Sequence, residues 1–376
     1  MRHRRSRAAI VTYLAMSVAG IVFGTALALH SPITWGVDFN EFYSAGKLTG
    51  TGHLYDPAAL QPLELQHTSR AVPFGRIPFF AFAFRPLSAM PYAVARVLWM
   101  GFGFGALAAV VALWPLSRWE RLAAALCWSV PTVMCLTFGQ DSVLFLFFVA
   151  LGLRLLLSGR EFWAGVALSA CAAKPQLALL FPILLAARGK WRAVLGGATG
   201  GAVILLVSFA VEGTGWPGLL LALSRTPEFN PAADRMPTFT GLLSMFGGST
   251  PLVIAGALAV AGGCWVLGRQ LPLPAAMALT LAGGLLVSPH AYAYDALLLL
   301  PALMLPFEGD YPLWMQTWGV LLMTPIPYLI LLSNNELPGH LAVTGYTLAL
   351  FAVEAVRARR RAPLLAAVGA LGQADR

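Results

Sequence analysis

Two acidic residues, Asp38 and Glu41, lie three positions apart in the segment GVDFNEFYSAGK, shortly after a long apolar run. If this segment is helical, the two carboxyl groups lie on one face, because residues three apart are neighbours on a helix. A carboxylate in this position can take the proton of a substrate hydroxyl. The same spacing is also a capping pattern for a short helix carrying Phe39, Phe42 and Tyr43, so both interpretations stay open.

A histidine and a lysine are further candidates for binding charge. His290 lies in SPHAYAYD at the predicted end of an apolar span, where it can donate to a phosphate oxygen or exchange a proton near neutral pH. Lys174 lies in the middle of an apolar stretch, where a charge is tolerated only against protein or a water-filled cavity. The alternatives are a hydrogen-bonded interfacial histidine and a structural ion pair that uses Asp295 of the same block.

Three more polar groups lie beside apolar runs. Arg76 and Arg85 bracket the run IPFFAFAF, where they either extend to lipid head groups or bind a lipid phosphate. Asp141 follows Gly139-Gln140, where it suits the N-cap of the next span as well as a functional site.

The four cysteines stand singly in apolar stretches, so we predict no disulfide framework, no metal site and no cofactor. No phosphate-binding loop or dinucleotide fingerprint is present, so nucleotide chemistry is unsupported.

Composition limits the elements that can position these groups. The chain of 376 residues is 58% apolar and 11% charged, whereas a soluble domain is about 25% charged. This excludes a soluble domain and a disordered chain. If each span needs about 20 apolar residues, the length allows roughly ten to twelve. We therefore predict an all-α polytopic membrane protein with about twelve transmembrane helices, forming a single integral membrane domain over residues 1–376.

The arginines beside apolar segments indicate the orientation. Four precede the first apolar segment and four follow the last: Arg2, Arg4, Arg5, Arg7, Arg357, Arg359, Arg360 and Arg361. Positively charged flanks of membrane spans face the cytoplasm, so we place both termini there. The net charge of +9 thus reflects membrane topology, and no nucleic-acid partner is expected.

Hydropathy predicts a first span at residues 8–29 and further spans near residues 92–114, 122–138, 142–157, 193–211, 252–268, 274–287, 296–307, 313–332 and 341–356. Residues 30–91 form a large extracytoplasmic loop, and residues 212–240 form a second one. The stretch 162–187 is too short for two crossings and is predicted to be a broken or re-entrant pair of half-helices, each about 18 Å long. The polar clusters converge on the outer face, which suits a substrate with a lipid tail and a polar head.

The order of the motifs GVDFNEFYSAGKLTGTGHLYDPAAL, PFFAFAFRPLSAMPYAVARVLW, FGQDSVLFLFF and LLVSPHAYAYDALLLLPAL resembles glycosyltransferase family 87. These are membrane transferases with the C-type fold that use polyprenol-phosphate-linked sugars, mostly mannose. The resemblance covers residues 8 to about 310 and implies that Asp38 is the catalytic base and that His290 helps to hold the lipid phosphate. An asparagine commonly follows the Gly-Gln step in this family, whereas Asp141 follows it here.

The resemblance implies an inverting hexosyltransferase that acts on the outer side of a bacterial cytoplasmic membrane. Its partners are a polyprenyl-phosphate-linked sugar donor, a glycolipid or glycan acceptor, and membrane lipids. We expect Lys174 and the two arginines to stabilise the departing phosphate. The supporting residues are Glu41, Tyr43, Gln140, Asp141 and Asp295.

Two other functions compete with this hypothesis. A transporter or flippase for a polyprenyl-linked or other amphiphilic substrate also uses broken helices and an intramembrane lysine. Against it, the sequence shows no internal repeat, and its polar groups gather at one face instead of the membrane midplane. A lipid-binding scaffold is the third candidate, and it would tolerate the loss of Asp38.

Overall fold

The computed structural model describes residues 36–116, 129–226, 229, 232–333 and 335–374, and these residues form helices and turns but no β-strand. Four helices are long and apolar enough to cross a membrane: α5 (Tyr92–Leu113), α12 (Trp191–Glu212), α15 (Thr250–Gln270) and, in α20 (Leu337–Ala374), the part Leu337–Arg360. The protein is therefore an all-helical, multi-pass membrane protein, as predicted. Twelve spans are not shown by the described residues, and the expected span at residues 8–29 lies outside them.

Several expected spans are shorter in the structure. The apolar stretch 296–307 is covered by a 3-10 helix, η3 (Ala293–Leu299), and a nine-residue helix, α17 (Leu300–Glu308). The stretch 313–332 is divided into α18 (Leu313–Met323) and α19 (Ile326–Leu331) by a break beside Pro325. Proline lacks the backbone N–H that would continue a helix, so hydropathy alone overestimates the length of these elements. Between α15 and η3 lies α16 (Leu273–Val287), which is almost completely buried.

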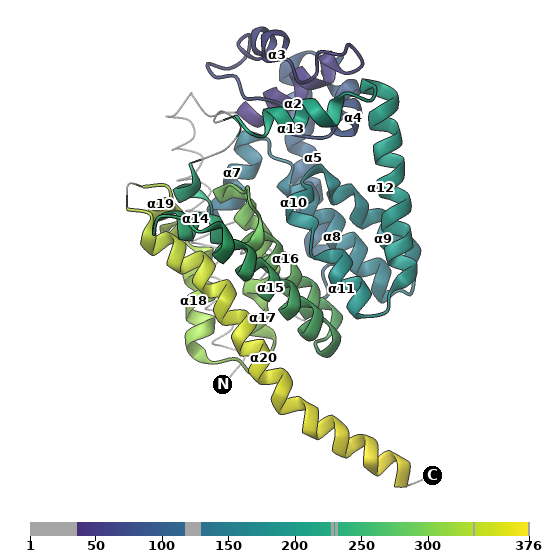
Figure 1. Ribbon diagram of the computed structural model, residues 1–376, viewed down its shortest axis with the longest axis vertical. Helices are drawn as coiled ribbons and strands as arrows, with labels where there is room; N and C mark the ends of the chain where they lie inside the picture. Colours follow the sequence, from purple (N-terminus) through teal and green to yellow (C-terminus); the bar gives the residue numbers. More distant parts are fainter. Residues whose placement is uncertain (1–35, 117–128, 227–228, 230–231, 334, 375–376) are drawn as a thin grey trace.

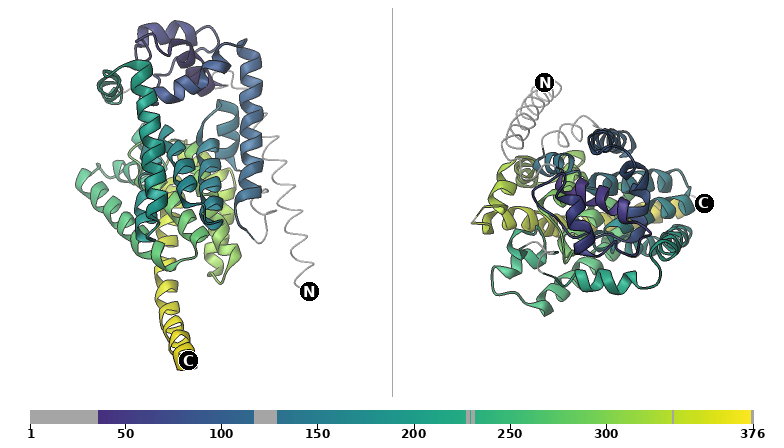
Figure 2. Two further views of the ribbon diagram at one scale, coloured as in Figure 1. Left: turned by 90° about the vertical axis from the view of Figure 1, so that its right-hand side faces the viewer. Right: turned by 90° about the horizontal axis from the view of Figure 1, so that it is seen from above.

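Short helices form a cap over one end of the membrane helices. Figure 1 shows α2 (Val37–Leu48), α3 (Pro57–Glu64), α4 (Pro78–Ser88) and α13 (Trp216–Leu223) together at this end, and the C-terminal part of α20 projects from the opposite end. The left view of Figure 2, turned by 90°, shows the same arrangement. The cap has its own apolar core, in which the rings of Phe39, Phe42 and Phe84 pack with Trp99 of α5. Two smaller helices follow α13 in sequence, η2 (Ala233–Arg235) and α14 (Phe239–Ser244).

A sharp bend beneath the cap separates α7 (Val130–Phe138) from α8 (Ser142–Leu157), whose axes differ by 114°. Gly139 ends α7 with a φ of 80°, a left-handed conformation that costs glycine little. A β-carbon at this position would lie 2.5 Å from the Cβ of Phe39 in α2. The glycine therefore makes the turn and brings the Gln140-Asp141 pair close to α2.

The stretch predicted as a broken pair consists of four short helices: α9 (Glu161–Ser169), η1 (Ala170–Ala173), α10 (Pro175–Ala178) and α11 (Phe181–Ala187). The break falls at Lys174, because the ring of Pro175 disfavours a helical conformation of the preceding residue. The Lys190 ammonium lies 2.7 Å from the carboxylate of Glu161, so the two ends of the stretch lie together. The stretch is thus a hairpin with Lys174 at its tip.

Candidate active site

Asp38 and Glu41 lie in the first turns of α2, and the site is built around them. The N-cap residue is Gly36, so Asp38 lies inside the helix and is not its cap. Asp38 accepts a hydrogen bond from the side chain of Gln140. Burial raises the pKa of Asp38 to about 6, although this hydrogen bond and the charges of Lys174 and Arg76 oppose the increase. Asp38 is therefore ionised at neutral pH and accepts a proton only slightly below it.

Asp141 occupies the N-cap position of α8, but its carboxylate makes no capping hydrogen bond. It accepts two hydrogen bonds from Arg76 instead, at 3.0 Å from Nε and 3.2 Å from Nη2. Such two-pronged contacts fix the direction of a guanidinium group as well as its position. The third nitrogen, Nη1, makes only a long 3.5 Å contact with the carbonyl of Gly75. Arg76 is thus held next to the site with one nitrogen weakly bonded.

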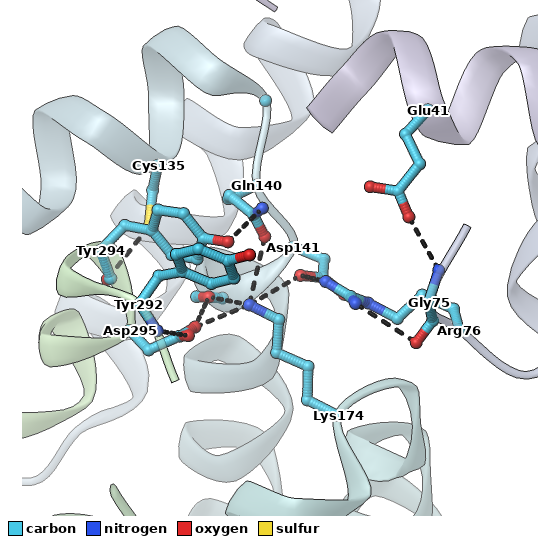
Figure 3. A network of polar contacts seen from close by, with 12 residues as sticks. Glu41, Gly75, Arg76, Cys135, Gln140, Asp141, Lys174, Tyr292, Tyr294 and Asp295 are labelled. Atoms are coloured by element: carbon cyan, nitrogen blue, oxygen red, sulfur yellow. Dashed lines mark hydrogen bonds and ion pairs between the residues drawn. The ribbon is translucent and has the colours of Figure 1, made fainter. Parts of the chain in front are cut away.

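Lys174 lies at the centre of a buried polar network (Figure 3). Its ammonium lies 2.6 Å from Asp295 Oδ1, 2.6 Å from Ser142 Oγ, 3.1 Å from Gln140 Oε1 and 3.1 Å from Asp141 Oδ1. An ammonium group has three protons, so these four acceptors use its full hydrogen-bonding capacity. The lysine therefore joins the bend after α7, the tip of the hairpin and the segment after α16.

The segment after α16 contributes both Asp295 and an aromatic wall. Asp295 Oδ2 accepts a hydrogen bond of 2.9 Å from the backbone N–H of Tyr292, which fixes the turn into η3. The rings of Tyr292 and Tyr294 stack at 5.1 Å, and the Tyr294 hydroxyl accepts a hydrogen bond from Gln140 at 2.8 Å. The ring of His290 packs edge-on against Tyr292 at 5.2 Å. Burial lowers the pKa of His290 to about 4, so this histidine is neutral at pH 7.

Two cavities meet at Lys174. A polar cavity of about 40 Å³ contains Asp38, Glu41, Arg76 and His290 in its wall, together with Val72, Pro73, Gly75, Gln140, Lys174, Gln176, Phe229, Tyr292, Tyr294 and Asp295. An apolar cavity of about 640 Å³ lies between α4, α5, α8, η1 and α12. Apart from Asp141 and Lys174, every side chain of its wall is apolar. Lys174 is the residue that both walls share.

Most of the candidate residues from the sequence lie together. The polar cavity contains seven of them: Asp38, Glu41, Arg76, Gln140, Lys174, His290 and Asp295. Asp141 contacts two of these cations from the side of the apolar cavity. Two candidates lie elsewhere. Arg85 is exposed on α4 and lies in neither cavity wall, and Tyr43 is buried in the cap, where its hydroxyl donates to the carbonyl of Met90 at 2.7 Å.

Sequence reasoning missed three contributors, namely Ser142, Tyr292 and Tyr294. The Tyr-x-Tyr spacing beside His290 was the available signal for the two tyrosines, since two aromatic side chains close to a polar group can line its site. Tyr292 is extended, with φ −105° and ψ 168°, whereas Tyr294 lies in the first turn of η3, and both rings line the polar cavity. No comparable signal exists for Ser142, whose hydroxyl donates to Asp295 and accepts from Lys174.

Comparison with known proteins adds the family. The sequence profile of glycosyltransferase family 87 matches residues 78–289, which is more than half of the chain. Curated proteins and solved structures gave no match. The matched region contains Gln140, Asp141 and Lys174, whereas Asp38 precedes it and His290 follows its last residue. The resemblance is thereby confirmed: the chain belongs to glycosyltransferase family 87 and is a transferase that uses a sugar donor and an acceptor.

Proposed function

We propose that the protein transfers a hexose, with mannose as the first candidate, from a polyprenyl-phosphate-linked donor to a hydroxyl group of a glycolipid or glycan. The observation that carries this proposal is the position of Lys174 in the walls of both cavities. The donor has the same order of parts. In our proposal its isoprenoid tail occupies the apolar cavity, its sugar enters the polar cavity, and the phosphate between them lies beside Lys174.

The apolar cavity supports a lipid-linked donor. Its volume of about 640 Å³ lies within the range of small-molecule sites, which is roughly 300 to 1,000 Å³. Aromatic side chains from three helices form much of its wall, including Phe80, Phe84, Trp99, Phe102 and Phe148. Water molecules form few hydrogen bonds with such a surface, whereas a hydrocarbon tail is stabilised there because its apolar surface is removed from water. The polar cavity holds only a few water molecules at about 40 Å³, so sugar binding requires its walls to move apart.

The cations can stabilise the departing phosphate. Breaking the bond between C1 of the sugar and the phosphate oxygen leaves the electron pair on the phosphate, which gains a negative charge. Arg76 and Lys174 place two positive charges next to this position, and Asp141 and Asp295 balance them before the donor binds. Because Lys174 has no spare proton, the phosphate must replace one of its partners. Nη1 of Arg76 is the nitrogen that can bind the phosphate with the smallest loss of existing hydrogen bonds, because its contact with Gly75 is long.

Asp38 is placed to act as the base. Its carboxylate takes the proton of the acceptor hydroxyl while the acceptor oxygen bonds to C1 from the face opposite the phosphate. A single displacement of this kind inverts the configuration at C1. No acid is needed for the leaving group, because a phosphate departs as a stable anion. One carboxylate therefore suffices for the reaction, unlike the pair used in glycoside hydrolysis.

We also propose the membrane arrangement. The cap lies outside, both termini lie in the cytoplasm, and the chain crosses a bacterial cytoplasmic membrane about twelve times with the C-type architecture. The distribution of charge supports this orientation, since five cations flank the end of α8, the beginning of α9, the end of α11 and the beginning of α12: Arg154, Arg160, Arg188, Lys190 and Arg192. Figure 1 shows α12 running from there toward the cap. In this orientation the hairpin 162–187 enters from the cytoplasmic side and carries Lys174 to the site.

A reconstituted assay tests the proposal. Purified protein in liposomes is given radiolabelled mannosyl-phosphoryl polyprenol and an alkyl mannoside or a membrane glycolipid extract. We expect a new glycoside and an equal amount of released polyprenyl phosphate, and no product from a nucleotide sugar alone. Transfer directly from the nucleotide sugar would contradict the donor class. Movement of the labelled lipid across the bilayer without a new glycoside would instead favour the transporter hypothesis.

A further inference from the structure

The wall of the polar cavity contains three carboxyl groups, those of Asp38, Glu41 and Asp295, and two cations, Arg76 and Lys174. Two cations, Arg76 and Lys174, form ion pairs with Asp141 and Asp295. Three further carboxyl groups belong to Asp38 and Glu41 of α2 and to Glu64 at the end of α3, and none of the three forms an ion pair with a described residue. Buried ionised carboxylates without a cation are costly, so some of the three must carry a proton.

Glu41 faces the polar cavity and forms no ion pair with a described residue. It is 4% exposed, and one oxygen accepts a hydrogen bond of 3.1 Å from the backbone N–H of Gly75. Figure 3 shows its other oxygen pointing away from Gly75, toward the side of Gln140 and Asp141. Asp38 differs, because it receives a hydrogen bond from Gln140 and because the charge of Lys174 lowers its pKa.

We propose that Glu41 is held as a neutral carboxylic acid and donates a hydrogen bond to an oxygen of the acceptor, next to the hydroxyl that Asp38 deprotonates. This inference rests on the proposed function. Glu41 lies one helical turn from Asp38 on the same face, so the two side chains meet neighbouring atoms of one substrate. An acceptor bound in this way carries an oxygen next to its reacting hydroxyl, as a sugar ring does and a serine side chain does not.

The surroundings of Glu41 agree with this assignment. Burial raises the pKa of Glu41 well above its usual range, the carboxylate of Asp38 acts in the same direction, and the charge of Arg76 opposes them. Burial also raises the pKa of Glu64 to about 8, so Glu64 adds no charge beside Glu41 at neutral pH. Asp38 therefore supplies the ionised carboxylate, and Glu41 supplies the neutral donor. Environments that separate the pKa values of two acids assign them different roles in this way.

An infrared experiment tests the protonation state without any substrate. We compare purified wild type with Glu41→Gln at pH 7 and follow the carbonyl stretch of protonated carboxyl groups. The expected result is that Glu41→Gln removes part of this band. The control is Glu161→Gln, which changes a carboxylate ion-paired with Lys190 and should alter only the carboxylate band. An unchanged band in Glu41→Gln would overturn the proposal, because Glu41 would then be ionised.

Kinetic constants test the role. Glu41→Ala should lower kcat/KM for the acceptor roughly 10- to 100-fold, the range of a lost hydrogen bond to a buried group, and leave the KM of the donor unchanged. Glu41→Gln still offers an N–H donor and should recover most of this loss. The proposal is wrong if Glu41→Gln is as inactive as Asp38→Asn, because Glu41 then acts as a carboxylate. It is also wrong if added Mg²⁺ raises activity only when Glu41 is present. If wild type itself transfers no sugar, the proposed function fails, whereas the infrared result stands independently.

Discussion

The ammonium of Lys174 lies 2.6 Å from the carboxylate of Asp295, although the two residues are 121 positions apart in the sequence. Both side chains are buried, at 4% and 3% exposure. The pair joins the tip of the hairpin 162–187 to the segment that carries His290 and the stacked tyrosines. One contact therefore sets the distance between the predicted phosphate site and the aromatic wall of the polar cavity.

Replacing Lys174 should lower the stability of the protein. Lys174→Met leaves the buried carboxylate of Asp295 without a cation, while Asp141 keeps Arg76, so we expect a loss of about 3 kcal/mol in the free energy of unfolding. Thermal unfolding in detergent measures it. The double variant Lys174→Met/Asp295→Asn should recover most of the stability but no transfer activity. Equal stability of the two variants would show that the ion pair is not what holds these segments together.

His290 should act on the donor through a hydrogen bond and not through charge, since it is neutral at pH 7. His290→Ala should raise the KM of the donor about tenfold, which corresponds to one hydrogen bond, and change the acceptor KM little. His290→Gln, whose amide can still donate, should keep most of the donor affinity. Steady-state kinetics with each substrate varied in turn distinguish the two effects. A changed acceptor KM with an unchanged donor KM would place His290 on the other substrate.

Filling the apolar cavity should affect long donors most. Ala83 of α4 lies in the wall of this cavity, and Ala83→Trp would occupy space that the proposed isoprenoid tail uses. We expect a KM increase of about tenfold for a full-length polyprenyl donor and a smaller one for a donor with a two-isoprene tail. Phe82→Trp is the matched control, because Phe82 lies on the same helix but outside the cavity. Equal effects of the two tryptophans would argue that the tail binds elsewhere.

Much of the fold follows from sequence patterns that are local. Apolar runs near 92–114, 193–211, 252–268 and 341–356 coincide with the four long helices, because the bilayer fixes their length and composition. The break at Lys174 follows from Pro175 in the same way. The run at 296–307 is apolar because it is buried among other helices, and the run at 313–332 is divided by Pro325. Hydropathy does not distinguish either case from a membrane span.

The site is harder to predict, because its geometry depends on contacts between distant segments. The three-residue spacing of Asp38 and Glu41 does predict that both side chains line one cavity, because this spacing acts within a single helix. By contrast, Arg76 and Arg85 flank the same apolar run, and the sequence does not indicate which of the two reaches the site. Arg76 precedes α4 and reaches Asp141, whereas Arg85 lies on the exposed side of the helix. The apolar surroundings of Asp295 did indicate an ion pair, and Lys174 is its partner. No sequence pattern indicates that Asp141 would be a second partner of Lys174.

The measurement that tests the account most directly is the pH dependence of sugar transfer by wild type and by Asp38→Asn. A base whose pKa is about 6 is ionised above pH 6 and protonated below it. We therefore predict that kcat/KM of wild type is constant near neutral pH and falls about tenfold per pH unit below pH 6, and that Asp38→Asn is at least 100-fold slower with no such limb. Transfer by Asp38→Asn within tenfold of wild type, or a variant that retains the acidic limb, would show that another group removes the acceptor proton.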